Sequence, residues 1–183
     1  GVLDGSLDPA VLDTYEAERK PHARKMIDLA LLVGRAMTAG GEVGDRLRRT
    51  LVPRMHLMPG MRNKITDSAT PSLPRSALVH KTYRRRQLTG TLCPNTEEEG
   101  GQRLDSLLGN AFALITTVAP AAADQTYVEG RGATVYHAQP GTELAAWLRR
   151  GGACAAVVRP DRTVMRAGRD VHELCRALPT RRP

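Results

Sequence analysis

The chain has 183 residues and a formal net charge of +8, from 27 Lys and Arg against 19 Asp and Glu. This length suits one domain of ordinary size with a helical extension and is short for two full domains. Arginines are spread along the chain and aromatic residues make up only 3% of it, which argues against a nucleic-acid interface of basic clusters and stacking rings. No run approaches the roughly 20 apolar residues of a membrane span. We therefore expect neither nucleic acid nor a membrane as a partner.

The cysteines and histidines show no pattern of a disulfide framework or a metal site. Cys93, Cys154 and Cys175 are odd in number and far apart, whereas disulfide scaffolds and zinc knuckles need cysteines in pairs. The five histidines include no i, i+4 pair, the spacing that places two imidazoles on one face of a helix. The sequence therefore predicts reduced thiols, a cytoplasmic location and no metal.

The first predicted element is a long amphipathic helix. Asp8 can cap its free N–H groups, and Pro9 fits the first helical position, where no N–H bond is needed. Glu16 precedes two basic residues by three and four positions, which pairs opposite charges on one helical face. Pro21 lacks an N–H and crowds a carbonyl of the preceding turn, so we expect a kink or a fresh helix start there. The pattern ends near the two glycines at residues 40–41. Apolar positions after the proline are Ala23, Met26, Ala30, Val33 and Met37.

Residues 42–76 separate this helix from the rest of the chain. Asp45 can cap a second short helix with an apolar stripe, a feature more typical of a core or an interface than of a ligand site. From residue 59 to 76 the composition shifts to residues that favour turns and bury little. We therefore predict a helical arm at 1–58, a linker at 59–76 and a domain at 77–183. The stripe consists of Leu47, Leu51, Met55 and Met58.

The domain at 77–183 alternates strands and helices. Short apolar, β-branched runs predict strands, and the run at 112–118 is typical of a strand buried on both faces. The predicted strands are 77–80, 112–118, 133–136, 153–158 and 163–165; the predicted helices are 104–108, 142–150 and 171–178, with a turn or short helix at 120–124. The order strand, helix, strand, hairpin, helix is typical of a thioredoxin-like layer. The predicted fold class is α/β: a thioredoxin-like C-terminal domain preceded by a helical arm and a linker.

A thioredoxin-like fold raises the question of redox chemistry, which needs a C-x-x-C motif just after the first core strand. Residues 119–123 occupy that place and contain no sulfur. Cys154 falls in a predicted strand and Cys175 in a predicted helix, so we expect both thiols to be buried and inert. The sequence also lacks the G-x-S-x-G elbow of a hydrolase and the G-x-G-x-x-G turn of a dinucleotide site. We therefore predict no catalytic, cofactor-binding or metal-binding residue within this chain.

Three blocks of the sequence resemble segments of one known family. They are residues 12–23 (LDTYEAERKPHA), 104–115 (LDSLLGNAFALI) and 157–164 (VVRPDRTV). Similar segments occur in this order in single-component flavin-dependent aromatic hydroxylases, which include phenol and 3-(3-hydroxyphenyl)propionate hydroxylases. In that family the first segment follows the FAD-binding domain and leads into a C-terminal domain of thioredoxin-like fold. The resemblance implies that the chain is the C-terminal part of such an enzyme, with its helical arm continuing from a missing N-terminal FAD domain.

The resemblance also implies what each part does. The parent protein would use FAD, NAD(P)H and O2 to hydroxylate a phenolic substrate, with a 3-(3-hydroxyphenyl)propionate-type acid favoured over a phenol or a polyketide. The chain alone would bind no cofactor and would serve structure and subunit contacts in a homo-oligomer, expected to be a dimer. We expect Tyr15, Glu16 and Arg19 to contact the FAD domain, the two charged residues through charge-assisted bonds. Plain ion pairs on the helix surface are the competing interpretation.

An alternative from a different class is a stand-alone, redox-inactive thioredoxin-like module that binds acidic partners through an arginine-rich surface. The chain also contains a run of four basic residues, Lys81 and the three arginines at 84–86, which could bind a phosphate or a carboxylate. A solvated charged face is the more common role of such a run. A G-x-G-x-x-G strand and helix encoded upstream in the native gene would distinguish the two functions.

Overall fold

The computed structural model describes residues 7–38, 72–81, 88–98 and 100–179, together with residues 2, 3, 5, 41, 45 and 49. The chain forms two compact units, one made of residues 1–18 with 72–183 and the other of residues 19–71. Three groups of predicted features lie outside the described residues: the stripe Leu47, Leu51, Met55 and Met58, most of the linker, and the arginines at 84–86.

The long helix begins as predicted but does not restart at its proline. A short 3-10 helix, η1 (Pro9–Leu12), comes first, and the Asp8 side chain caps it by accepting a backbone N–H bond at 2.9 Å. The helix α1 (Asp13–Thr38) then continues with Pro21 inside it, so the expected fresh start is wrong. Pro21 removes the hydrogen bond to the carbonyl of Ala17. Ala17 is exposed, so water can satisfy that carbonyl instead.

From residue 104 onward, helices and strands alternate. In chain order they are α4 (Leu104–Leu108), β1 (Ala113–Thr116), α5 (Ala122–Gly130), β2 (Thr134–His137), α6 (Glu143–Arg150), β3 (Ala155–Val158), β4 (Val164–Gly168) and α7 (Val171–Arg176). Side-chain caps mark two of the helix starts: Thr142 accepts from a backbone N–H of α6, and Asp170 from one of α7. Among the described residues, no helix combines the length and the apolar character that crossing a membrane requires.

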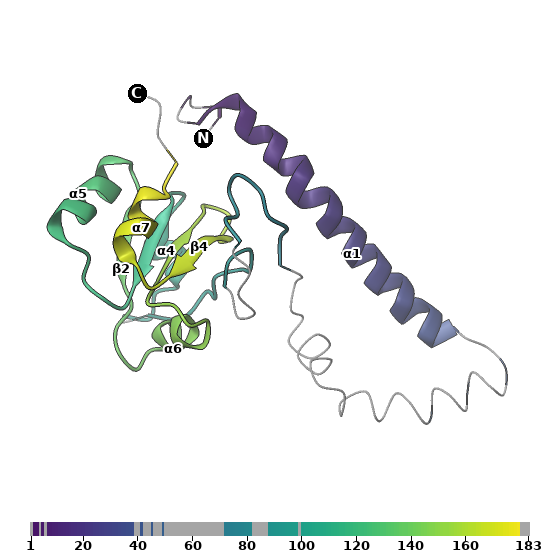
Figure 1. The fold of residues 1–183 in the computed structure, drawn as a ribbon. Coiled ribbons are helices and arrows are strands. Elements are labelled where there is room, and N and C mark those ends of the chain that lie inside the picture. The colour runs from purple at the N-terminus through teal and green to yellow at the C-terminus, as the bar shows by residue number, and fades with distance from the viewer. Residues whose placement is uncertain are drawn as a thin grey trace. The chain divides into compact units, whose positions relative to one another are not determined.

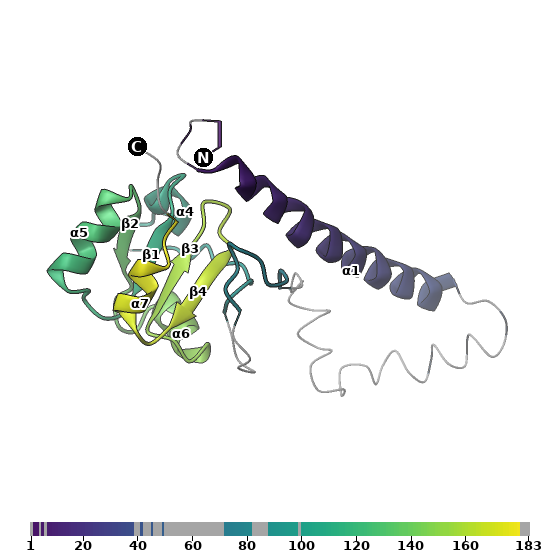
Figure 2. The same ribbon diagram turned by 45° about the horizontal axis from the view of Figure 1, so that its top comes forward.

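The strands form one mixed sheet in the order β2-β1-β3-β4 (Figures 1 and 2). β1 is parallel to β2 and antiparallel to β3, and β3 is antiparallel to β4 with a register shift between Val157 and Val158. All four residues of β1 and of β3 are buried, as expected for central strands covered on both faces. The sheet therefore combines a parallel β1–α5–β2 crossover with an antiparallel β3–β4 hairpin.

The core consists of two hydrophobic clusters, one on each face of the sheet. Ile115 of β1 belongs to a cluster with Leu144 of α6 and the two leucines that α4 buries. Leu114 belongs to the other cluster, with Val128 of α5 and Leu174 of α7. Neighbouring residues on a strand point to opposite faces, so α4 and α6 cover one face and α5 and α7 cover the other. Each fully buried leucine or valine stabilises the fold by about 1.5–3 kcal/mol.

Two elements differ from their predictions. The run at 77–80 is not a strand, because Ser76 and Val79 form an isolated bridge around a tight turn. The Ser76 hydroxyl accepts the N–H of Leu78 at 3.0 Å, a local bond that competes with a strand ladder. Conversely, the predicted turn or short helix at 120–124 lies at the start of the longer helix α5.

Candidate functional site

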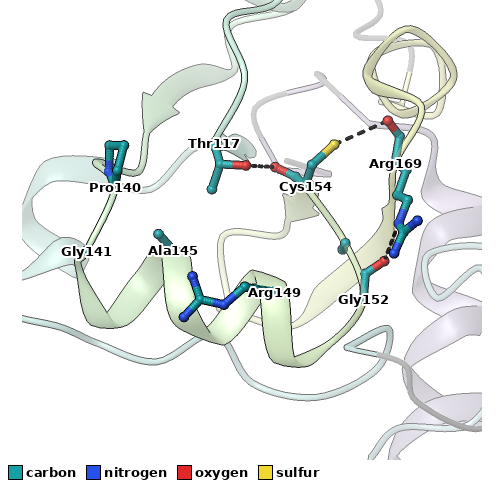
Figure 3. Close-up of a pocket in the computed structure, with 9 residues that line it drawn as sticks. Thr117, Pro140, Gly141, Ala145, Arg149, Gly152, Cys154 and Arg169 are labelled. Atoms are coloured by element: carbon teal, nitrogen blue, oxygen red, sulfur yellow. Dashed lines mark hydrogen bonds between the residues drawn. The ribbon is translucent and has the colours of Figure 1, made fainter.

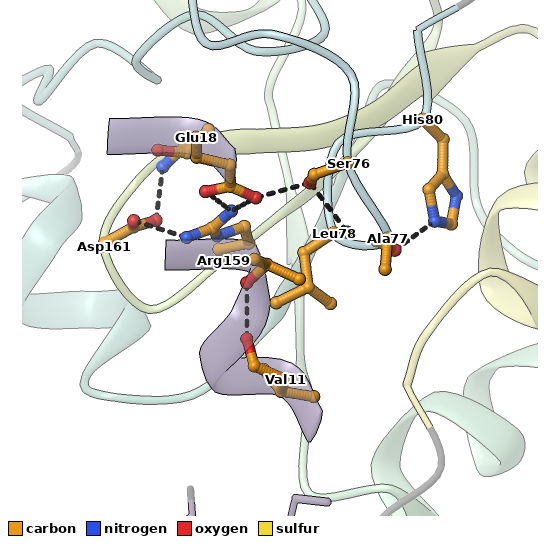
Figure 4. A network of polar contacts seen from close by, with 10 residues as sticks. Val11, Glu18, Ser76, Ala77, Leu78, His80, Arg159 and Asp161 are labelled. Carbon is orange, nitrogen blue, oxygen red and sulfur yellow. Dashed lines mark hydrogen bonds and ion pairs between the residues drawn. The ribbon is translucent and has the colours of Figure 1, made fainter. Parts of the chain in front are cut away.

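A buried carboxylate on α1 is the centre of the main polar network in the larger unit. Glu18 is only 1% exposed, although most of the residues around it on the helix are exposed. Arg159 donates to both of its carboxylate oxygens, at 2.9 and 2.7 Å, and the Ser76 hydroxyl donates to it at 2.5 Å (Figure 4). A buried carboxylate is tolerated when it is paired with a cation and its lone pairs are hydrogen-bonded, and Glu18 meets both conditions.

The turn between β3 and β4 positions Arg159 for this contact. Asp161 accepts the N–H of Thr163 at 3.1 Å, and the N–H of Arg159 donates to the Thr163 carbonyl at 2.9 Å. At the tip, Arg162 adopts a positive φ of 64°, which is uncommon outside glycine and costs about 1–3 kcal/mol. Asp161 also binds the second Nη of Arg159 at 2.8 Å. The Arg159 guanidinium is therefore paired with two carboxylates of this chain, those of Glu18 and Asp161.

The strained Arg162 connects the same turn to α4. Its Nε donates to Asp105 Oδ1 at 2.6 Å, and its Nη2 donates to the carbonyls of Asp105 and Gly109 at 2.9 and 2.7 Å. Its Nη1 is buried with no partner among the described residues. These bonds offset the backbone strain at Arg162, because a charge-assisted hydrogen bond contributes more to stability than a neutral one.

The three sequence blocks therefore meet at one place. Glu18 belongs to the first block, Asp105 and Gly109 to the second, and Arg159 and Arg162 to the third. We call this arrangement the block junction. Its geometry ties Glu18 of α1 and both ends of α4 to the β3–β4 turn through charge-assisted bonds. The contacts within it are ion pairs and hydrogen bonds among residues of this chain.

Of the residues selected from the sequence, Tyr15 is 68% exposed, and Glu16 and Arg19 are also exposed. Their expected contact with an FAD domain stays a prediction. Glu18, which lies between Glu16 and Arg19 in the same block, was missed. Helical spacing reveals partners three or four residues away, but Arg159 is 141 residues away. The one available signal was that every block contains an acidic residue and that the first and third blocks also contain arginines.

A second feature of the larger unit is a surface hollow of about 430 Å³. It lies where β1 ends, α6 begins and β3 begins (Figure 3). Thr117 Oγ1 donates to the carbonyl of Cys154 at 3.1 Å, and Cys154 Sγ donates to the carbonyl of Arg169 at 3.2 Å. The lining residues are Thr117, Pro140, Gly141, Ala145, Arg149, Gly152, Ala153, Cys154 and Arg169.

The cysteines have different environments, and all three are free thiols. Burial is the main cause that raises the pKa of the Cys93 thiol to about 12, and burial also raises the pKa of Cys175. Both thiols therefore stay protonated near neutral pH and are poor nucleophiles. Cys154 precedes β3 and is only half-buried, so its expected full burial is wrong. It is one of the residues that line the hollow, and its thiol is directed at the Arg169 carbonyl.

Metal and flavin ligands were also considered among the described residues. No group of three His, Cys, Asp or Glu side chains there could hold a metal ion. An FAD pyrophosphate needs a glycine-rich turn between a strand and a helix. The turn from β1 to α5 runs through residues 117–121, which contain no glycine. This turn therefore does not fit an FAD pyrophosphate.

Comparison with known proteins gives two kinds of match, while no protein-family model matches the chain. The 3-(3-hydroxy-phenyl)propionate/3-hydroxycinnamic acid hydroxylase of Mycolicibacterium smegmatis is 31% identical over 98% of this chain and 37% of its own length. The enzyme of the same name from Mycolicibacterium vanbaalenii is 31% identical over 78% of this chain and 27% of its own length. The chain thus spans about a third of the length of these relatives.

Solved structures agree on the fold. A RebC-10x structure with bound 7-carboxy-K252c has a TM-score of 0.64 at 19% identity, over 96% of this chain and 38% of that one. A complex of aklavinone-11 hydroxylase with FAD and aklavinone has a TM-score of 0.60 at 19% identity, over 95% of this chain and 36% of that one. At this identity the structural match shows a shared fold. Together with the sequence matches it confirms the resemblance: the chain is related along nearly its whole length to a part of the flavin-dependent aromatic hydroxylases.

Proposed function

We propose that this chain is the C-terminal part of a single-component flavin-dependent monooxygenase that hydroxylates a phenolic substrate of the 3-(3-hydroxyphenyl)propionate type. The observation that carries the proposal is the 31% identity to a hydroxylase of that name over 98% of the chain. In the proposed reaction NAD(P)H supplies two electrons, one oxygen atom of O2 enters the ring, and the other leaves as water. A polyketide is the second candidate substrate, since one structural neighbour is an aklavinone hydroxylase.

Within the parent protein, we assign this chain a structural role. The turn from β1 to α5 contains no glycine to hold an FAD pyrophosphate, which supports placing the flavin in another part of the parent that would bind and orient it. The block junction supports this assignment, because charged residues from the three family-like blocks form ion pairs with one another. Tyr15, Glu16 and Arg19 are exposed on α1 and are the proposed contacts to the FAD domain. We also propose that the parent protein is a dimer in the cytoplasm and that the three cysteines of this chain are reduced there.

The order of elements supports a thioredoxin-like domain without its redox motif. From β1 to α7 the chain follows strand, helix, strand, helix, strand, strand, helix, in a sheet of order β2-β1-β3-β4. A C-x-x-C motif would lie between β1 and α5, and residues 117–121 contain no cysteine. The fold therefore serves as a scaffold in this proposal, because function resides in sites and not in folds.

The test is to express the protein from its native gene and assay it with candidate substrates. We expect a yellow protein of several hundred residues that oxidises NAD(P)H faster when 3-(3-hydroxyphenyl)propionate is added, with the hydroxylated product detected by mass spectrometry. Aklavinone and phenol are the comparison substrates. A colourless native protein of about this size would refute the proposal and favour the stand-alone module that binds acidic partners.

The proposed domain contact is tested separately in the intact enzyme. Glu16→Ala together with Arg19→Ala should weaken FAD retention or lower the melting temperature, because shielded charge-assisted bonds would be lost. Unchanged FAD affinity and stability would show that these residues form surface ion pairs only.

A further inference from the structure

The hollow beside Cys154 lies at the end of the sheet where the parallel strands finish. Thr117 follows β1, and Pro140 and Gly141 connect β2 to α6. β3 runs antiparallel to β1, so its first residues reach the same end. In α/β sheets, the carboxyl ends of parallel strands are the usual place for ligands, because loops diverge there around a rigid frame.

The lining of the hollow combines a positive charge with an apolar wall. Arg149 of α6 and Arg169 of the β4–α7 connection contribute two guanidinium groups, and no carboxylate lines the hollow. In the described part of the chain, neither arginine forms a salt bridge, and the one hydrogen bond of the Arg169 side chain runs from Nε to the Gly152 carbonyl at 3.2 Å. Its Nη groups are therefore available to an anion. Pro140 and Ala145 supply apolar surface beside these charges.

This situation differs from that of the other central arginines in the same unit. The side chains of Arg159 and Arg162 are 13% and 16% exposed, and each is paired with a carboxylate of this chain. Arg149 and Arg169 instead carry their charge at the wall of a cavity (Figure 3). An arginine presents several N–H donors in a planar fork that matches a carboxylate.

We propose that this hollow is a binding site for a small organic carboxylate. Arg149 and Arg169 lie on different sides of the lining (Figure 3) and supply the positive charge that attracts the carboxylate group, while Pro140, Ala145 and Ala153 contact the apolar body of the ligand. The Thr117 hydroxyl is already engaged with the Cys154 carbonyl and holds the end of β1 against the start of β3. Every residue that lines the site belongs to this chain. Binding to the site can therefore be measured without the flavin reaction.

Cys154 provides a reporter inside the site. Cys154 is half-buried and lines the hollow, and its thiol donates to Arg169, another lining residue, whereas Cys93 and Cys175 are buried in the core. A ligand that fills the hollow should therefore slow the reaction of Cys154 with a thiol reagent without affecting the other two cysteines. This readout is independent of any enzymatic activity.

The experiment uses the whole 183-residue chain, with benzoate as the ligand and benzamide as its uncharged match. We expect saturable binding of benzoate in titration calorimetry and protection of Cys154, and neither effect with benzamide. Arg149→Gln or Arg169→Gln should weaken benzoate binding about tenfold, the typical loss for one charge-assisted contact. Arg150→Gln is the matched control, since it removes the same charge from the same helix outside the hollow, and it should stay within twofold.

Three outcomes would overturn the proposal. Equal binding of benzamide would show that charge plays no part, and equal loss in Arg150→Gln would show that only net charge matters. Inorganic phosphate binding as tightly as benzoate would show that the apolar wall contributes nothing. Because Arg149, Arg150 and Arg169 are exposed, the variants should fold; matching circular dichroism spectra would verify this.

Discussion

Replacing Glu18 by glutamine tests whether the block junction stabilises the domain. The change keeps the shape of the side chain but removes the charge that Arg159 contacts at 2.7 Å. The new amide N–H2 would also face guanidinium donors, while Asp161 continues to neutralise part of the Arg159 charge. Breaking a buried pair by removing one partner costs about 3–5 kcal/mol. Because Arg159 keeps one carboxylate, we expect a loss of about 2–4 kcal/mol for Glu18→Gln.

The assay is urea unfolding of the whole chain, followed by far-UV circular dichroism and by Trp147 fluorescence. Glu16→Gln is the control: it makes the same chemical change two residues earlier at an exposed position, where a pair contributes about 0–1 kcal/mol. A double variant, Glu18→Leu with Arg159→Met, should be more stable than the sum of its single changes predicts, by about 1–3 kcal/mol. Unfolding free energies of Glu18→Gln and the parent chain within about 0.5 kcal/mol of each other would refute the structural role of the pair.

Three further predictions concern backbone strain and the thiols. Gly90 has φ +84°, and a Cβ there would lie 2.8 Å from a backbone carbonyl oxygen, so Gly90→Ala should cost about 2–4 kcal/mol. Gly141→Ala, at φ +90° with open space around it, should cost only about 1 kcal/mol in the same urea assay. Cys154 should react first with a thiol reagent in the native protein, and labelling of Cys93 or Cys175 at a similar rate would contradict the burial argument. The Cys93 pKa rises from 9.0 to about 12 on folding, so its contribution to stability is complete below pH 9 and is lost as the pH approaches 12, by up to about 1.4 kcal/mol per unit. Compared with Cys93→Ala, the parent chain should therefore lose stability faster over this range, and parallel pH profiles would argue against the shift.

Local chemistry made much of the fold predictable. The helix at residues 104–108 is confirmed at both ends, and Thr142 and Asp170 cap their helices through their own side chains. The apolar run around Ile115 forms a strand buried on both faces. In each case the signal lies within a few residues of the element it determines, so one sequence is enough to read it.

The rest depended on contacts between distant residues. Pro21 predicted a kink or a fresh helix start, and the fresh start is wrong because a proline whose orphaned carbonyl is exposed can remain inside a helix. Glu18 resembled any other acidic residue on a solvated helix until its partner was known. Cys154 was expected inside a strand, and a strand boundary one residue away is finer than an apolar pattern can locate. The block junction could not be built from spacing, because its members come from three separate blocks.

The Glu18–Arg159 contact also has a consequence for the folding pathway. Its partners are 141 residues apart in sequence, whereas the β3–β4 hairpin forms between neighbours. Closing a loop of that length is entropically costly, so the pair should form after the folding transition state, once the sheet exists. An interaction that forms late affects mainly the rate of unfolding. The pair would then slow the unfolding of the native domain. The folding rate would depend on the hairpin and its neighbours instead.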